Sequence, residues 1–409
     1  WAWLAAGLPS LALPLLWLSI RIPALRLTCA AVAALSPRRL IPALNIDRLE
    51  ETQKTLVVLP AVLSSGKQAI RLAAKLAALY HADPSPQIDY MLLADFQDAV
   101  SETQMDDAEI IRAASRAVDS LSEAYPARFL YFQRGRVWHR GEHAFMGRGR
   151  LGGLCEALES LLTEGSGEDA FVYSGVSPES LHRRYAYVVT LAEDAVIMPG
   201  TVHQLIGVLS HPLNQRNASQ GFGRIAPRPV PDSFTPTRIS RLAAFLRQPT
   251  PLGQLLTRVN GLSHGRGASI HMPHADENAP LLRGELSEVL LELSVLRAGL
   301  DACGEDAFTC VRLPVPRAWS GVLGALHHQA RGAWQSLPLL LPTLKGSEGR
   351  APNPLSPGRR LLVWQELWNT LSPLFQLGLL AFAVGAASPL LFAGALLLMV
   401  LSEGRFSPM

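Results

Sequence analysis

The chain has 409 residues, a formal net charge of +3 at pH 7 and a hydrophobic fraction of 48%. This apolar content, together with a positive mean hydropathy, is high for a fully soluble protein. No basic cluster with interleaved aromatic residues occurs in the sequence, so nucleic-acid binding is set aside. The four cysteines show no metal-type spacing and require no disulfides, which fits a reducing compartment.

The apolar residues are concentrated at the two ends of the chain. Residues 1–20 contain no charge and match the ~20-residue length of a helix that crosses a bilayer. A signal peptide is the alternative, but such peptides begin with a basic region, which this segment lacks. The chain begins with Trp1 rather than Met, so we expect it to be cut from a longer polypeptide.

A second uncharged stretch lies between Glu366 and Glu403, interrupted by Ser388 and Pro389. Two short helices or one long tilted helix would fit it. Basic residues lie on the inner side of both apolar ends, at Arg21, Arg26, Arg38, Arg39, Arg359 and Arg360. By the positive-inside rule, the middle of the chain is expected in the cytoplasm.

Tryptophans at Trp364 and Trp368 follow basic residues with helical spacing. This pattern predicts a helix that lies at the membrane surface. A core helix packed on the middle domain is the alternative interpretation.

The middle of the chain alternates apolar strand patterns with amphipathic helix patterns. This alternation predicts an α/β fold with a mostly parallel sheet, whose ligands lie at the carboxyl ends of the strands. Acidic residues follow two of these strands, at Asp95 and Asp98 and at Glu193 and Asp194. A nucleotide site is therefore expected at this edge, whereas residues 227–280 resemble loops. The strands are expected at Thr55–Leu63, Ile88–Phe96, Phe129–Phe132 and Tyr185–Leu191, and the helices at Lys67–Tyr80, about Asp106 to Ala124 and near Gly152–Leu162.

Several segments resemble cyclic β-1,2-glucan synthases. Met91–Ala99 is similar to the "LLTDFxDA" segment of that family, and Arg184–Leu191 resembles the strand in "RYVITLDADT". Further matches follow in the same order, with His211–Asn214 resembling "HPLN", Gly221–Arg228 "GYGILQPR", His327–Gln335 "HRWxRGDWQ" and Leu355–Arg359 "LSP". Such collinear matches, from about Leu40 to about Leu371, are more specific than any one short motif.

The resemblance implies a family-2-like glycosyltransferase with the A-type, Rossmann-like nucleotide-sugar fold, anchored in the bacterial inner membrane. It also implies transfer of glucose from UDP-glucose to a β-1,2-glucan, and a glycoside-phosphorylase-like module elsewhere in the parent chain. The expected organisation is a transmembrane helix and basic connector (1–45), the transferase domain (46–345), an interfacial helix region (346–370) and one or more membrane segments (371–409).

For the metal, the family's Asp-x-Asp motif aligns with Ala192, Glu193 and Asp194. The first carboxylate is missing, so Asp194 is the expected catalytic ligand of Mg²⁺ or Mn²⁺. Glu193 is a weaker candidate for the nucleotide-sugar site, because its side chain is expected on the opposite face of the strand.

For the nucleotide, the resemblance places Asp95 near the uridine, with Asp98 beside it. The family's "RGK" stretch aligns with residues 151–153, which leaves Arg148 and Arg150 as the nearest cations. The loss of that cation argues for weaker UDP affinity, with Arg150 as the candidate contact.

For the catalytic base, the family's "SHDLLEG" aligns with Arg283–Val289 and puts Glu285 at the position of the Asp. An exposed charge at a helix start is the alternative interpretation of Glu285. Arg266 lies in a stretch that resembles the family's "GKG" loop. The neighbouring histidines, His264, His271 and His274, are interpreted as ordinary loop residues rather than metal ligands.

For the acceptor and diphosphate, Arg331, Trp334 and Gln335 keep the outline of "RGDWQ", with Ala333 in place of the Asp. Arginine can bind a diphosphate with two hydrogen bonds, and tryptophan can stack on a glucosyl ring. Two main hypotheses therefore remain, and a different donor or reaction on the same fold is a third alternative. The chain is either an active UDP-glucose-dependent transferase or a catalytically degenerate module that acts as a scaffold or binds glucan.

Overall fold

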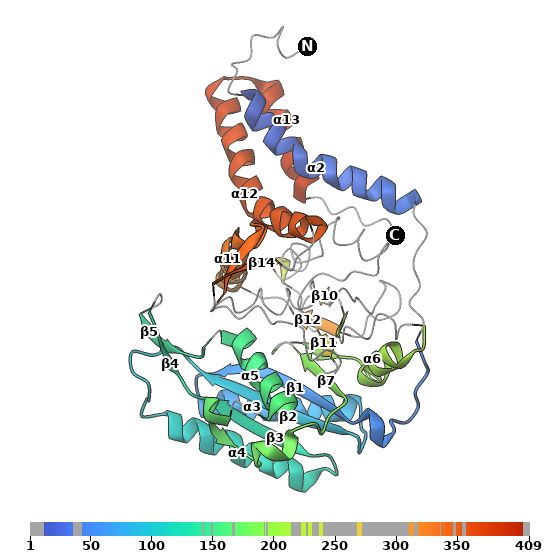
Figure 1. Ribbon diagram of the computed structural model, residues 1–409. Helices are drawn as coiled ribbons and strands as arrows, with labels where there is room; N and C mark the ends of the chain where they lie inside the picture. The colour runs from blue at the N-terminus through green and yellow to red at the C-terminus, as the bar shows by residue number, and fades with distance from the viewer. Residues whose placement is uncertain are drawn as a thin grey trace.

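The computed structural model describes residues 12–35, 43–140, 143–148, 150–165, 168–191, 193, 195–213, 222–225, 228–230, 237–239, 268–271, 311–314, 318–335, 337–346, 349–353 and 357–403. Two parts can be distinguished in Figure 1: an α/β body around one large sheet, and a group of long helices at the other end of the molecule. The predicted α/β class with a mostly parallel sheet is confirmed.

The large sheet has the strand order β6-β3-β2-β1-β7-β11-β9. Strands β3, β2, β1 and β7 run parallel, whereas β6 and β11 pair antiparallel with their neighbours. The strands are β1 (Thr55–Leu63), β2 (Ile88–Phe96), β3 (Phe129–Arg134), β6 (Phe171–Ser174), β7 (Tyr187–Leu191), β9 (Phe222–Ile225) and β11 (Ala268–His271). The expectation of loops throughout residues 227–280 is wrong at β11, which includes His271, and at β10 (Arg228–Val230), because both join sheets.

Both faces of the central strands are covered by helices, as expected for parallel strands with nearly continuous apolar sequences. Alternate residues of β1 point to opposite faces, so Val57 and Leu59 belong to one apolar cluster and Leu56 and Val58 to the other. Helices α3 (Gly66–Ala82) and α4 (Asp107–Ala124) supply the first cluster, and α5 (Arg150–Glu164) supplies the second.

Smaller elements complete the described part of the body. They are the hairpin of β4 (Val137–His139) and β5 (Ala144–Met146), α6 (Thr201–Ser210), and the sheet of β10, β12 (Val311–Pro314) and β8 (Val196–Ile197). Helix α11 (Trp319–Gln335) and the hairpin of β13 (Thr343–Gly346) and β14 (Gly349–Pro352) lie towards the long helices. Short 3₁₀ turns occur at Glu51–Gln53, Glu168–Ala170, Pro178–Leu181 and Leu337–Leu340.

Three long helices, α2 (Ala12–Leu35), α12 (Pro357–Gly385) and α13 (Pro389–Glu403), pack against one another (Figure 1). The chain breaks between α12 and α13 at Ser388, which agrees with the alternative of two helices in the second uncharged stretch. Among the helices that the structure describes, none combines the length and the apolar composition that crossing a membrane requires.

The tryptophan pair of the predicted surface helix lies in the first half of α12. Trp368 is 8% exposed, whereas Trp364 is 39% exposed. The guanidinium carbon of Arg21 lies 4.5 Å from the centroid of the Trp368 ring and 5.8 Å from that of Trp364. This cation–π arrangement joins α2 to α12, so the basic residue expected to face the cytoplasm also serves packing between helices.

Candidate functional site

The carboxyl ends of β1, β2 and β7 meet at one edge of the sheet, because these three strands are parallel neighbours. This is the edge at which ligands bind in open α/β sheets. Asp95, the penultimate residue of β2, lies in register with Val62 of β1 and Arg134 of β3. Glu193 follows β7 on the other side of β1. The structure therefore brings Asp95, Asp98 and Glu193 to one edge, as the sequence predicted.

Asp95 forms a buried ion pair with Arg134. The Nε atom of Arg134 donates to Oδ1 of Asp95 at 2.8 Å, and Nη2 donates to Oδ2 at 2.7 Å. Asp95 is 2% exposed and Arg134 is 4% exposed. Two parallel hydrogen bonds fix both the position and the plane of the carboxylate. Arg134 of the neighbouring strand thus neutralises and orients the Asp95 carboxylate, which was expected to face a nucleotide.

Two glycines approach this ion pair closely. A Cβ atom at Gly147 would lie 2.6 Å from Cγ of Asp95 and 2.8 Å from Nη2 of Arg134. A Cβ atom at Gly153 would lie 3.3 Å from Nη1 of Arg134 and 3.0 Å from the carbonyl carbon of Arg148. Gly153 is one of the residues aligned with the family's basic stretch. Its close contact with backbone explains why a longer side chain does not fit there without rearrangement.

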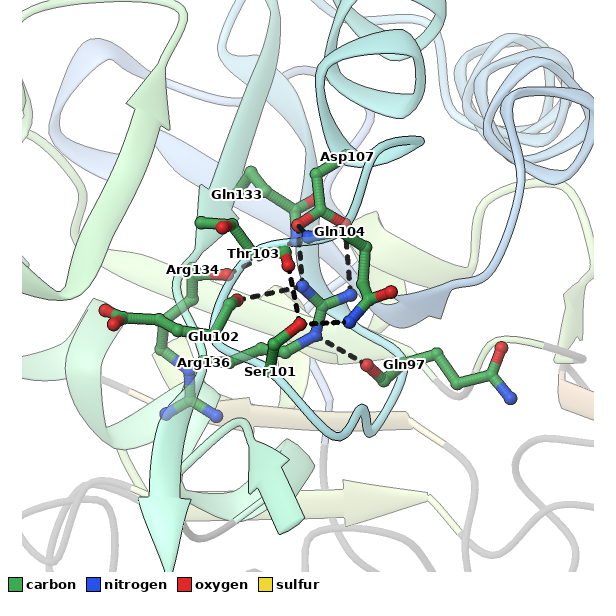
Figure 2. Close-up of polar contacts among 9 residues, drawn as sticks. All are labelled: Gln97, Ser101, Glu102, Thr103, Gln104, Asp107, Gln133, Arg134 and Arg136. Carbon is green, nitrogen blue, oxygen red and sulfur yellow. Dashed lines mark hydrogen bonds and ion pairs between the residues drawn. The ribbon is translucent and has the colours of Figure 1, made fainter.

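A second buried arginine lies two residues after Arg134. Arg136 is 6% exposed and forms two hydrogen bonds with the carboxylate of Asp107, at 2.7 Å and 3.0 Å. Figure 2 shows this arginine inside the connection between β2 and α4, with its guanidinium directed at Asp107 and at the backbone of Gln97 and Glu102. The connection that carries Asp98 is thereby attached to the end of β3.

Glu193 is held by side chains of helix α3. Its Oε1 accepts a hydrogen bond from Nε2 of Gln68 at 3.3 Å and lies 3.8 Å from Nη2 of Arg71. The ammonium of Lys75 donates to the backbone carbonyl of Glu193. The carboxylate of Glu193 is therefore directed towards α3.

The other predicted site residues are less completely described. Asp98 is exposed in the connection after β2, and Arg150 is the first residue of α5, but its side chain lies outside the described residues. Arg331, Trp334 and Gln335 form the last turns of α11, where Trp334 is 47% exposed and the other two side chains are not described. Ala192, Asp194, Arg266 and Glu285 lie outside the described residues.

The part of the chain that the structure describes contains no group of three or more His, Cys, Asp or Glu side chains that could hold a metal ion. Asp194, the expected ligand of Mg²⁺ or Mn²⁺, lies outside that part. Glu193 does not fit this role as placed, because its carboxylate already contacts a glutamine and an arginine of α3.

Arg134, Arg136 and Gly147 were missed in the sequence. A usable signal was present, because the Arg-Gly-Arg run from Arg134 to Arg136 begins at the last residue of a parallel strand that neighbours β2. Since the carboxyl ends of such strands meet, a cation there is placed to reach a carboxylate at the end of β2.

No known family model matches the chain. Cyclic β-(1,2)-glucan synthase NdvB of Rhizobium meliloti is 28% identical to it over 329 residues, which cover 74% of this chain and 11% of NdvB. The chain therefore corresponds to about a ninth of that protein's length.

Among solved structures, mannosyltransferase PcManGT from Pyrobaculum calidifontis, in complex with GDP-Man and Mn²⁺, has a TM-score of 0.48 and 10% identity, covering 95% of this chain and 97% of that one. TarS 1–349 of S. aureus has a TM-score of 0.35 and 10% identity, covering 86% and 81% of the two chains. The resemblance found in the sequence motifs is confirmed by the comparison with NdvB: this chain is similar to a segment of a cyclic β-(1,2)-glucan synthase.

Proposed function

We propose that this chain is a glycosyltransferase module that transfers glucose from UDP-glucose to a growing β-1,2-glucan. The observation that carries the proposal is the oriented carboxylate of Asp95 at the carboxyl edge of a parallel sheet. A carboxylate in a fixed plane is suited to accept a hydrogen bond from the N–H group of a uracil ring. The similarity to NdvB supports the choice of glucose and of the β-1,2 linkage.

In the proposed reaction, a hydroxyl oxygen of the glucan attacks the anomeric carbon of glucose. A bond between that carbon and the acceptor oxygen forms, the bond to the phosphate oxygen breaks, and UDP departs. The hydroxyl proton passes to a carboxylate base, for which Glu285 is the candidate. Mg²⁺ or Mn²⁺ at Asp194 is the proposed partner of the diphosphate, and Arg150, Arg266 and Arg331 are the candidate cations around the donor.

We place this reaction at the cytoplasmic face of the bacterial inner membrane. Apolar side chains are exposed on the long helices, among them Leu27 (67%), Leu35 (87%), Leu390 (84%) and Leu397 (58%). Exposed leucines on packed helices are costly in water and favourable in lipid, which supports an association with the bilayer. The acceptor contacts proposed on α11 are Trp334 and Gln335. A phosphorylase-like module of the parent protein is a further proposed partner.

Catalytic degeneracy is the second candidate function, and one contact favours it. Gly153 occupies the position of a family cation, and its backbone is too close to Arg148 for a longer side chain. Ala192 and Ala333 also stand where the family has aspartates. Because the site lacks these three charged groups, it would bind UDP weakly. The module would then act as a scaffold or a glucan-binding partner.

Calorimetry of UDP and UDP-glucose, with Mg²⁺ or Mn²⁺, on the detergent-solubilised chain tests the proposal. Metal-dependent binding is expected, and a separate transfer assay should show formation of β-1,2-glucan. Binding should become tighter after Ala192→Asp restores the first carboxylate of the Asp-x-Asp motif. Asp95→Asn should weaken UDP binding, whereas Asp119→Asn on the exposed surface of α4 should not. Binding without any sugar transfer would favour degeneracy, and no nucleotide binding at all would refute the transferase proposal.

A further inference from the structure

The guanidinium of Arg136 is buried inside the connection between β2 and α4, which consists of residues 97–106 (Figure 2). Its Nε donates to the carbonyl oxygen of Gln97 at 2.7 Å, and its Nη1 donates to the carbonyl oxygen of Glu102 at 3.1 Å. The first residue and the middle of the connection are therefore attached to the same side chain.

The end of the connection is attached to Arg136 as well. Nη1 and Nη2 donate to the two oxygens of Asp107, which also accepts a hydrogen bond from the backbone of Gln104 at 2.8 Å. The guanidinium carbon lies 4.5 Å from the centroid of the Phe96 ring at the end of β2. One buried side chain thus joins the end of β2, the connection and the start of α4.

Apolar burial does not explain the shape of this connection. Val100 is 90% exposed and Met105 is 99% exposed, so neither side chain contributes appreciable hydrophobic stabilisation. Polar contacts hold the segment instead, including two backbone hydrogen bonds between Ala99 and Phe145 of β5, at 2.9 Å and 2.8 Å. The contacts of Arg136 are the buried, charged members of this set, and they are therefore the ones expected to matter most.

We propose that Arg136 is a positioning residue for the nucleotide site, acting through the connection that follows Asp95. The inference rests on the proposed binding of a nucleotide at Asp95. The connection begins two residues after Asp95. At the end of β3, Arg134 binds Asp95 and Arg136 binds the connection. A connection that is ordered before the nucleotide arrives spares the ligand the entropic cost of ordering it.

Lysine cannot replace arginine in this arrangement. The hydrogen bonds of Arg136 use three nitrogen atoms that point in different directions within one plane. A lysine ammonium carries the same charge at a single point and cannot form these bonds together. Arg136→Lys therefore removes the geometry while it keeps the charge. Arg112→Lys is the matched control, because Arg112 is exposed on α4 and its Nε donates to the carbonyl oxygen of Ala108 on the same helix.

Two measurements on the detergent-solubilised full chain test the inference: amide hydrogen exchange of residues 97–106 and calorimetric UDP affinity. In Arg136→Lys without UDP, amide exchange in this segment should become roughly tenfold faster. UDP should bind to this variant roughly tenfold more weakly. Saturating UDP should restore slow exchange, because a ligand that needs the ordered segment also stabilises it. Arg112→Lys should match the parent chain in both measurements.

Asp107→Asn provides a second route to the same site if Arg136→Lys folds poorly. It should reproduce both effects, and the double variant should be little worse than either single one, since the two residues act as one pair. Unchanged amide hydrogen exchange of residues 97–106 in both variants would show that Arg136 and Asp107 do not order the connection, and would overturn the proposal. Faster exchange with parental UDP affinity would overturn the positioning role. A parent chain that binds no UDP would instead refute the proposed function, and the positioning role with it.

Discussion

Arg134 and Asp95 form a two-hydrogen-bond ion pair, at 2.8 Å and 2.7 Å, between the ends of two parallel strands. Both side chains are almost fully buried. The pair fixes the position and the plane of a carboxylate that the sequence presents as a ligand contact. Because both charges are buried, the stability of this edge of the sheet depends on the presence of both partners.

Removal of one partner of this pair should be costly. Asp95→Asn leaves the guanidinium of Arg134 buried without its counter-charge, so the free energy of unfolding should fall by ~3–5 kcal/mol. Urea denaturation monitored by circular dichroism measures this change. Replacing both residues by leucine should recover most of the loss, because a buried apolar pair leaves no uncompensated charge. A single Asp95→Asn variant as stable as Asp119→Asn would contradict the expectation.

Gly147 should tolerate no side chain. A methyl group at this position would come within 2.6 Å of Cγ of Asp95, so Gly147→Ala must displace the ion pair. We expect a loss of ~1–3 kcal/mol of stability from this overpacking, together with weaker UDP binding. Thermal unfolding and calorimetry measure the two effects.

The control for this substitution is Gly324→Ala in helix α11, where a Cβ atom would meet nothing within 4 Å. This change should be neutral or stabilising by up to ~1 kcal/mol, because alanine favours helix more than glycine does. Equal effects of the two substitutions would show that the predicted clash at Gly147 is absent.

The apolar face of α3 should carry much of the stability of the body. Leu76 is fully buried against the sheet, and Leu76→Ala should lower the free energy of unfolding by ~2–5 kcal/mol. Ile70 lies on the same helix and is 54% exposed, so Ile70→Ala should have a much smaller effect. Paired urea denaturation curves make the comparison. Similar losses for both variants would mean that α3 does not pack as described.

Stability should decline at alkaline pH because of buried tyrosines. Burial, followed by the nearby charge of Asp89 and its hydrogen bond, raises the pKa of Tyr185 well above its ordinary value. Burial also raises the pKa of Tyr90, with Asp83 as the next cause. The unfolded tyrosines lose their protons above ~pH 10, whereas the folded ones stay neutral, so unfolding is favoured as pH rises beyond that value.

Tyr185→Phe tests this pH dependence. The variant should lose ~1–3 kcal/mol at pH 7, because the hydroxyl donates a 2.7 Å hydrogen bond to the buried carboxylate of Asp89. Its stability should nevertheless fall less steeply than that of the parent chain between pH 9 and pH 11. Urea denaturation midpoints of both chains, measured across this pH range, test the prediction. An equally steep fall in both chains would show that Tyr185 does not cause the loss of stability.

The parallel core was predictable because its signals are local. The runs Thr55–Leu63 and Ile88–Phe96 match β1 and β2 at both ends, since a strand covered on both faces is apolar at most of its positions. The antiparallel strands β6 and β11 were not predicted. Both strands have four residues and depend on partners distant in sequence, as β11 depends on β7 and β9.

The sequence alone determined the α/β class, the resemblance to cyclic β-1,2-glucan synthases and the placement of Asp95 at a strand end. These properties depend on local composition and on the order of motifs along the chain. Only the tertiary structure decided what Asp95 contacts, that Arg136 holds the following connection, and that Glu193 faces α3. Hydrogen-bond partners are chosen by spatial proximity across strands, and the separations of 39 residues in the first case and 125 in the last leave no periodic trace in the sequence.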